Sequence, residues 1–232
     1  MKNIIQRNGL ILGGFALVTT SIIAITYGFT AQRIEQVKER QLLSTLNQVV
    51  ASSMHDNELH TDCIQIQANE LLGNKPQRVF RSRKGSDNTA LIIETTAPDG
   101  YSGAIDLVVA IDTNNTVLAA RVINHKETPG LGDKVELRVS DWILSFTDVI
   151  YDEQRDSRWA VRKDGGQFDQ FTGATITPRA VVNAIKNAAI FGQTNMQSLF
   201  TMPANCQTGS VAIKVTSDPA LQAISAQEVA GE

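Results

Sequence analysis

The pattern of apolar and polar residues is most uneven at the start of the chain. Residues 1–8 include Lys2 and Arg7 and no acidic residue, and residues 9–31 then contain no charged residue, Asn, Gln or Pro. As a helix this run of 23 residues would be about 35 Å long at about 1.5 Å per residue. The hydrocarbon core of a bilayer is about 30 Å thick. The pattern therefore predicts a transmembrane helix over residues 9–31.

A cleaved signal peptide is the alternative for this run. The apolar stretch is longer than the signal-peptide core of about 7–15 residues, and no Ala-x-Ala cleavage site follows it. We therefore favour an uncleaved span. Lys and Arg are nearly balanced across it, although the basic residues after it alternate with Glu35 and Glu39. The positive-inside rule then favours a cytoplasmic position for residues 1–8 and places the rest of the chain beyond the membrane.

The periodicity changes after the apolar run. Apolar residues recur at spacings of three and four between residues 33 and 54, which predicts an amphipathic helix that continues out of the membrane. We expect a stalk over residues 32–60 and one folded domain over residues 61–207. Residues 208–232 are small and polar and are expected to form a loose tail.

The first half of the domain is rich in β-prone residues. Four runs predict strands at residues 78–83, 90–96, 104–111 and 116–123. Turn-forming residues at 98–100 and 112–115 separate the later runs, so the last two strands are expected to form a hairpin.

The clearest helix of the domain covers residues 178–191. Thr177 is a suitable N-cap, Pro178 suits the first helical position, and Gly192 is placed as a stop. Apolar residues at helical spacing give this helix one buried face.

Three weaker elements complete the expected fold. Residues 141–146 favour a helical turn, and residues 159–161 and 211–215 favour short strands. Because strands and helices do not alternate along the chain, the pattern predicts an α+β domain with an antiparallel sheet.

Composition excludes some classes of function. The chain has 21 Lys and Arg against 24 Asp and Glu, a net charge of −3, and no dense basic block, so nucleic acid is not expected as a partner. Cys and His are not grouped at metal-ligand spacing, and no catalytic motif of the G-x-S-x-G, H-E-x-x-H or G-x-G-x-x-G type occurs. We expect neither a metal site nor a catalytic residue of those kinds.

The chain has two cysteines, Cys63 and Cys206. They are either joined in one disulfide or are two unrelated buried thiols. A membrane anchor in front of them favours an oxidising compartment and hence the disulfide.

Residues 164–178 form a Gly-containing loop that leads into the predicted helix. The N-terminus of a helix has unpaired N–H groups and a partial positive charge, and it attracts phosphate. Three hydroxyls lie there, on Thr172, Thr175 and Thr177. On local spacing alone, the simpler interpretation is that Thr177 caps the helix and the other two line a turn.

The string D-x-x-T-G-A-T at residues 169–175 resembles the flavinylation motif of FMN-binding domains. In that family a flavin transferase moves FMN from FAD onto the last threonine and leaves a phosphoester link. The resemblance implies covalent FMN on Thr175, with Thr177 beside the phosphate as a donor. The other motif positions of this chain are Asp169, Thr172, Gly173 and Ala174.

Two further segments resemble the same family. The string E-T-P-G-L-G at residues 127–132 is similar to a segment near the isoalloxazine ring, and residues 99–103 are similar to a turn near the flavin. Glycines in such a loop allow the backbone to approach a planar ligand closely. The resemblance implies cofactor-binding roles for Tyr101, Glu127, Thr128, Pro129, Gly130, Leu131 and Gly132.

The order of span, stalk, hairpin and loops is most similar to the family of G subunits of Rnf ion-translocating electron transport complexes. That family is related to the C subunits of sodium-pumping NADH:quinone reductases. The resemblance implies a single-pass protein of the bacterial inner membrane with a periplasmic flavin domain. It would relay electrons in a complex that links ferredoxin and NAD chemistry to ion transport, without independent catalysis. The implied partners are the other Rnf subunits, including a second flavinylated membrane subunit and iron–sulfur subunits, and the flavin transferase during maturation.

Two other functions stay open at this point. A membrane-anchored interaction or assembly subunit without a cofactor would use the threonine-rich loop only as a helix entry. A hydrolase with Thr175 as nucleophile would need a general base, for which Asp169 is the nearby candidate.

Overall fold

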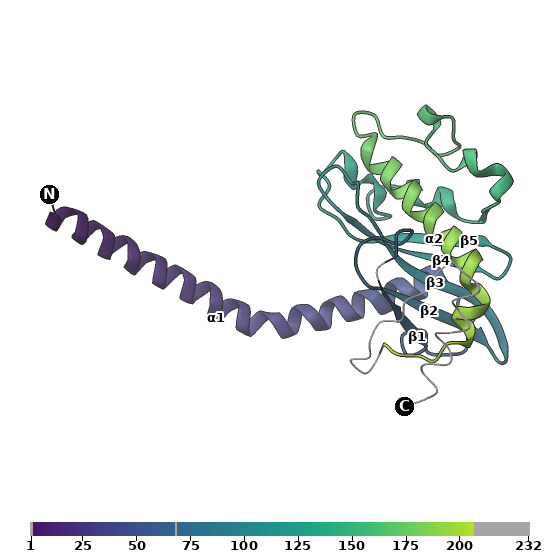
Figure 1. The fold of residues 1–232 in the computed structure, drawn as a ribbon, viewed down its shortest axis with the longest axis horizontal. Helices are drawn as coiled ribbons and strands as arrows, with labels where there is room; N and C mark the ends of the chain where they lie inside the picture. The colour runs from purple at the N-terminus through teal and green to yellow at the C-terminus, as the bar shows by residue number, and fades with distance from the viewer. Residues whose placement is uncertain (1, 68, 207–232) are drawn as a thin grey trace. The chain divides into compact units, whose positions relative to one another are not determined.

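The computed structural model describes residues 2–67 and 69–206. They belong to two compact units, one up to Ser44 and one from Thr45 onward. Helix α1 (Lys2–Val49) supplies the first unit and enters the second (Figure 1). The strand and tail expected at residues 211–215 and 208–232 lie outside the described residues.

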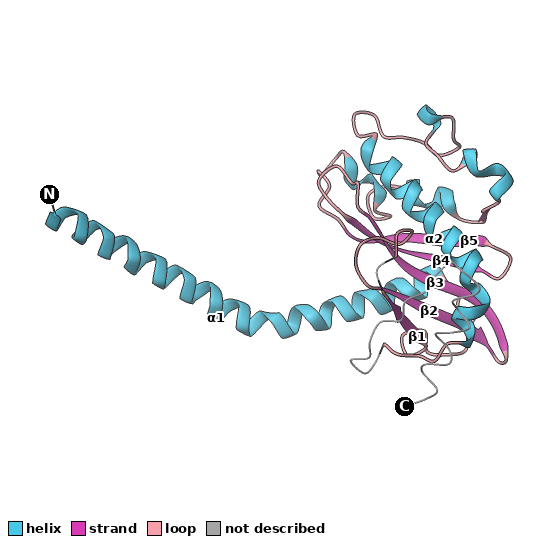
Figure 2. Ribbon diagram, in the orientation of Figure 1, coloured by secondary structure: helices cyan, strands magenta, loops and turns pink. Residues whose placement is uncertain are grey.

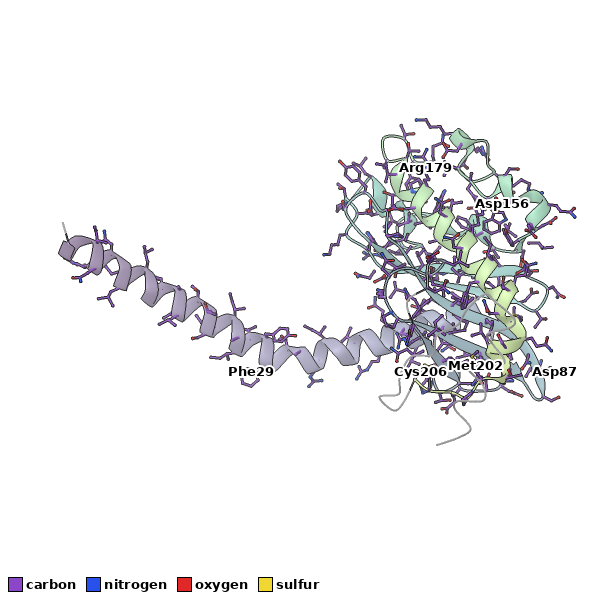
Figure 3. The ribbon with its side chains drawn as sticks, viewed as in Figure 1. Phe29, Asp87, Asp156, Arg179, Met202 and Cys206 are labelled. Carbon is purple, nitrogen blue, oxygen red and sulfur yellow. A yellow bond between two sulfur atoms is a disulfide. The ribbon has the colours of Figure 1, made fainter. Side chains whose placement is uncertain are left out.

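The first part of α1 is long and apolar enough to cross a membrane, over Ile5–Ala31. Its large apolar side chains are exposed, and Figure 3 shows Phe29 pointing out from the helix. The hydroxyls of Thr20, Thr26 and Thr30 donate to carbonyls one turn earlier in the helix. Such bonds satisfy polar groups where no water is present. The predicted span is thus confirmed as a candidate transmembrane helix.

Helix α1 ends at Val49, whereas the periodicity extended to residue 54 and the expected stalk to residue 60. Beyond the end of the helix, Asn57 is bonded to the backbone of the domain. Its Oδ1 accepts from the N–H of Arg83, and its Nδ2 donates to the carbonyl of Arg81, each at 2.9 Å. These bonds attach the segment after the helix to a strand.

The domain contains a six-stranded sheet in which strand order follows chain order and every pair is antiparallel (Figure 2). The strands are β1 (Cys63–Ile66), β2 (Gln77–Lys84), β3 (Asp87–Ala97), β4 (Ile105–Asp112), β5 (Thr116–Asn124) and β6 (Val149–Ile150). The four predicted strands and the α+β class are confirmed. In the turn between β4 and β5, Oδ1 of Asp112 accepts from the N–H groups of Asn114 and Thr116. The short strands β1 and β6 were not predicted.

Helix α2 (Ile176–Thr201) packs on one face of this sheet (Figure 1). It continues through Gly192, so the predicted helix stop was wrong. A Cβ at Gly192 would come within 3.1 Å of the side chains of Ile93 and Ile111. The glycine therefore allows close packing of the helix on β3 and β4 rather than ending the helix.

Short 3-10 helices connect β5 to α2 in the described part of the chain. Two lie between β5 and β6, η1 (Gly132–Val135) and η2 (Asp141–Phe146), and two lie between β6 and α2, η3 (Glu153–Arg158) and η4 (Arg162–Asp164). The predicted helical turn at residues 141–146 is η2. The strand predicted at residues 159–161 is wrong, because only Val161 forms a bridge, with Phe168. Trp159 is buried among aromatic rings instead.

The end of α2 is tied to the first strands. Cys206 is joined to Cys63 by a disulfide, and Asn205 bonds to the backbone of Gln65 on the edge strand β1. The buried guanidinium of Arg81 donates to the carbonyl of Leu199 and pairs with Asp62. Figure 3 shows Arg179 and Met202 at opposite ends of α2, so these ties lie far from the start of the helix.

Candidate functional site

Three segments meet at the N-terminal end of α2. They are the turn after β3, the loop after β5 and the residues that lead into the helix. Together they enclose a cavity of about 220 Å³. Its lining residues are Tyr101, Glu127, Thr128, Leu131, Gly132, Gly173, Ala174, Thr175, Ile176 and Thr177.

The carboxylate of Glu127 holds the three segments together. Glu127 is only 5% exposed. Its Oε2 accepts a hydrogen bond from the hydroxyl of Thr177 at 2.6 Å, and its Oε1 accepts from the N–H of Ser102 at 3.0 Å. A buried carboxylate is stable in a protein only when such donors satisfy it. Glu127 therefore stabilises the geometry of the cavity.

Two glycines leave the space that this carboxylate occupies. A Cβ at Gly132 would lie 2.5 Å from Oε2 of Glu127 and 2.9 Å from the hydroxyl oxygen of Thr177. A Cβ at Gly100 would lie 3.0 Å from Oε1 and would overlap the carbonyl oxygen of Gly103. Only glycine fits at either position without displacing the Glu127 side chain.

A histidine supports the loop from behind. Nδ1 of His125 accepts the N–H of Glu127 at 2.9 Å, and Nε2 donates to Glu136 at 2.5 Å. This network assigns the ring proton to Nε2. Arg138 also donates to Glu136. Hydrogen bonding from Arg138, with a smaller contribution from His125, holds the pKa of Glu136 below its ordinary value although burial opposes this.

The segment before α2 is hydrogen-bonded to the domain through its backbone, whereas some of its side chains are exposed. The indole N–H of Trp142 on η2 donates to the carbonyl of Asp169 at 2.8 Å. Gly173 has a φ of 80°, which suits glycine, and the next N–H, of Ala174, donates to the carbonyl of Phe171. The side chain of Asp169 is exposed and pairs with Arg162 at 3.0 Å.

The predicted helix cap is wrong. The N-cap residue of α2 is Thr175, without a side-chain cap bond, and Thr177 is already inside the helix. The hydroxyl of Thr177 turns to the Glu127 carboxylate because that acceptor is charged and buried, and a bond to it is stronger than one to a backbone group. Pro178 is tolerated in the first turn, where N–H groups lack partners inside the helix.

An ion pair ties the first turn of α2 to the loop before it. Arg179 donates to both carboxylate oxygens of Asp164, at 2.6 and 2.8 Å. These bonds lower the pKa of Asp164 and raise that of Arg179. The pair links the first turn of α2 to the loop that contains Asp164.

Comparison with known proteins identifies the family. Residues 100–190 match the FMN-binding domain, and residues 1–49 match the RnfG N-terminal region. The chain is 48% identical to the G subunit of the ion-translocating oxidoreductase complex of Pseudoalteromonas atlantica over 209 residues, which cover 90% of this chain and 97% of the relative. It is 49% identical to the G subunit of the same complex from Vibrio cholerae strain O395 over 209 residues, which cover 89% and 99%. The chain belongs to the family of G subunits of ion-translocating oxidoreductase complexes.

As a member of this family, the chain is an electron-transport subunit with an FMN-binding domain, and the whole cavity lies inside the residues that match that domain. The cavity suits FMN chemically. Tyr101, Leu131 and Ile176 are 70%, 44% and 46% exposed and offer apolar contact to a planar ring. The first turn of α2 also lines the cavity, through Ile176 and Thr177, and the N-terminus of a helix attracts phosphate.

The structure brings together most of the site residues that the sequence of this G subunit predicts. Nine of them line the cavity: Tyr101, Glu127, Thr128, Leu131, Gly132, Gly173, Ala174, Thr175 and Thr177. Pro129 and Gly130 belong to the loop after β5 but do not line the cavity. Asp169 and Thr172 do not line it either, and both are exposed.

Sequence reasoning missed three residues of the site. Ile176 was predicted only as part of the helix entry, and its exposure at the first position of α2 is visible only in the structure. Gly100 and Ser102 were part of a recognised turn, but their relation to Glu127 has no signal in local sequence.

Among the described residues, no group of three or more His, Cys, Asp or Glu is arranged to hold a metal ion.

Proposed function

We propose that this subunit carries FMN covalently on the hydroxyl oxygen of Thr175 and relays electrons in an Rnf-type ion-translocating ferredoxin/NAD oxidoreductase. The observation that carries the proposal is the position of Thr175. It is the N-cap residue of α2, it lines the cavity, and it is the last residue of the D-x-x-T-G-A-T segment. When bound, a flavin accepts and donates electrons singly or in pairs.

The attachment step balances without a redox reagent. The oxygen of Thr175 forms a bond to the FMN phosphorus of FAD, the bond from that phosphorus to the AMP phosphate breaks, and AMP leaves. The hydroxyl proton of Thr175 leaves with the products. A flavin transferase provides the catalytic groups, so the residues of this chain need only present the hydroxyl.

Within the chain, the residues around Thr175 have positioning roles. The buried Glu127 carboxylate keeps the loop after β5 beside the start of α2, 2.6 Å from the hydroxyl oxygen of Thr177. The exposed apolar side chains of Tyr101 and Leu131 would contact the ring when FMN is bound.

Two features support the proposed compartment. The Cys63–Cys206 disulfide suits an oxidising environment, and the basic residues before the span favour a cytoplasmic N-terminus. We therefore propose that the span lies in the bacterial inner membrane and that the domain is periplasmic. Its proposed partners are the other Rnf subunits, including a second flavinylated membrane subunit and iron–sulfur subunits. Protease added to intact spheroplasts should cut the domain, and protection until lysis would refute this orientation.

In-gel flavin fluorescence tests the attachment. The chain is expressed with and without a flavin transferase, denatured and separated by electrophoresis. A fluorescent band should require the transferase and should be lost in Thr175→Ala and Thr175→Val. Thr175→Ser keeps a hydroxyl and should stay fluorescent. A colourless wild-type band in cells that flavinylate another acceptor would favour a cofactor-free assembly subunit.

A further inference from the structure

The loop that carries the proposed attachment site, residues 169–175, is bonded to the indole of Trp142. The N–H of Trp142 donates to the carbonyl of Asp169 at 2.8 Å. The same ring meets the ring of Phe171 edge to face, with centroids 5.1 Å apart. On its other side it meets Phe146 at 5.3 Å, so Trp142 connects η2 to the loop.

The residues just before this loop are anchored as well. The ring of Phe168 stacks on Phe146 with centroids 4.2 Å apart. The backbone of Phe168 exchanges hydrogen bonds with both sides of Val161, donating to the carbonyl of Ala160 and accepting from the N–H of Arg162. The backbone at Phe168 and Asp169 is therefore hydrogen-bonded to the rest of the domain.

Two exposed side chains of this loop, those of Asp169 and Thr172, contribute little to the fold. Thr172 is exposed and its hydroxyl has no hydrogen-bond partner among the described residues. The carboxylate of Asp169 has a partner, Arg162, but both side chains are more than 60% exposed, and such surface pairs stabilise little. The side chains of Asp169 and Thr172 are thus accessible to another protein.

We propose that the flavin transferase recognises this loop in its folded conformation and that Trp142 is the positioning residue that fixes it. The inference rests on the proposed attachment at Thr175 and names how that site is presented. A loop that is already ordered loses less conformational entropy when an enzyme binds it. If only the anchored conformation is competent, loss of the anchor lowers the competent fraction and raises the apparent KM by the same factor.

Trp142→Phe tests this with a matched control. The substitution keeps an aromatic ring in the cluster and removes the indole N–H. Trp159→Phe is the same chemical change in the same cluster, at the only other tryptophan of the chain. Trp159 contacts Phe146, Phe168 and Tyr151, and its indole N–H has no hydrogen-bond partner among the described residues.

The assay uses the unmodified full-length chain in detergent with FAD and purified transferase, and intact mass follows the initial rate of transfer. Trp142→Phe should raise the KM for the acceptor chain about five- to tenfold, in the range of one lost hydrogen bond, and leave kcat unchanged. Trp159→Phe should keep both constants within about twofold of wild type. If Trp142→Phe does not fold, Phe171→Leu removes the ring contact between Trp142 and the loop and should likewise raise KM.

The outcomes separate the two proposals. An unchanged KM, or faster transfer to Trp142→Phe, would overturn the inference, because the loop would then be modified after it leaves its anchored position. An equal rise in KM for Trp159→Phe would overturn it too, since the effect would come from the aromatic cluster as a whole. Failure of the wild-type chain to accept FMN from an active transferase would instead refute the attachment at Thr175.

Discussion

The hydroxyl of Thr177 donates to the carboxylate of Glu127 at 2.6 Å, and this bond joins two parts of the chain that are 50 residues apart. Thr177 has no exposed surface and Glu127 is 5% exposed. The bond fixes the loop after β5 against the first turn of α2, and the proposed FMN site lies between these two segments. The site therefore depends on a buried polar contact as well as on its lining residues.

Thr177→Val should destabilise the domain by about 1–3 kcal/mol, because it leaves one oxygen of a buried carboxylate without its donor while the side-chain shape is nearly kept. Chemical unfolding of the full chain in detergent, followed by tryptophan fluorescence, measures the change. Thr172→Val, at an exposed position of the same segment, should change the free energy of unfolding by less than about 0.5 kcal/mol. Equal effects of the two substitutions would contradict the role assigned to Thr177.

Gly132→Ala should destabilise the domain by about 1–3 kcal/mol through overpacking, because the new Cβ would lie 2.5 Å from Glu127. Since the added atom displaces the bonded pair, its cost should shrink in a Thr177→Ala background, with a coupling above about 0.5 kcal/mol. Gly130→Ala is the control. Gly130 has a φ of 79° and open space around it, so its cost comes from backbone strain and should add independently. Additive costs for Gly132→Ala would refute the proposed clash.

Reduction of the Cys63–Cys206 disulfide should lower the free energy of unfolding by about 2–5 kcal/mol, because the bond closes a loop over a sequence separation of 143. The double variant Cys63→Ser/Cys206→Ser should have the same lower stability and should not respond to reductant. A wild-type chain that is equally stable with and without reductant would mean that the two thiols are not joined.

The Asp164–Arg179 pair predicts a specific loss of stability in acid. The pKa of Asp164 is lower in the folded chain than its ordinary value, so its contribution is present above about pH 3.9 and is lost as the pH falls through the folded pKa. Asp164→Asn should lower Tm at pH 6, and the difference from wild type should shrink by pH 3. Asp141→Asn removes an exposed carboxylate without an ion pair among the described residues and should show no such trend. A Tm difference for Asp164→Asn that stays constant with pH would show that the Asp164–Arg179 pair does not stabilise the fold.

The fold was predictable where the local pattern carries the information. The uncharged run and the four β-prone runs define the span and the main strands. The strands β1 and β6 are short, and their pairing depends on partners distant in sequence, so local propensity does not reveal them. A glycine such as Gly192 is a common helix stop. In the fold it lies inside α2, where the side chains of Ile93 and Ile111 leave little room for a Cβ.

The site was predictable as a set of motifs and not as a set of contacts. Glu127 and Thr177 both belonged to recognised segments, yet their bond to each other replaced the helix cap expected for Thr177. Tertiary contact overrode the local preference, as propensity arguments allow. The bond between Trp142 and the backbone of Asp169 has no sequence signal, because a tryptophan in an apolar run indicates only a core position.

Intact mass of the chain purified from cells with an active flavin transferase tests the central claim most directly. The account predicts a chain heavier than its sequence by one FMN less one water, with fragment ions that carry the modification on Thr175, and no added mass in Thr175→Ala. An unmodified wild-type chain, while another acceptor in the same cells is flavinylated, or FMN attached at a different residue, would contradict it.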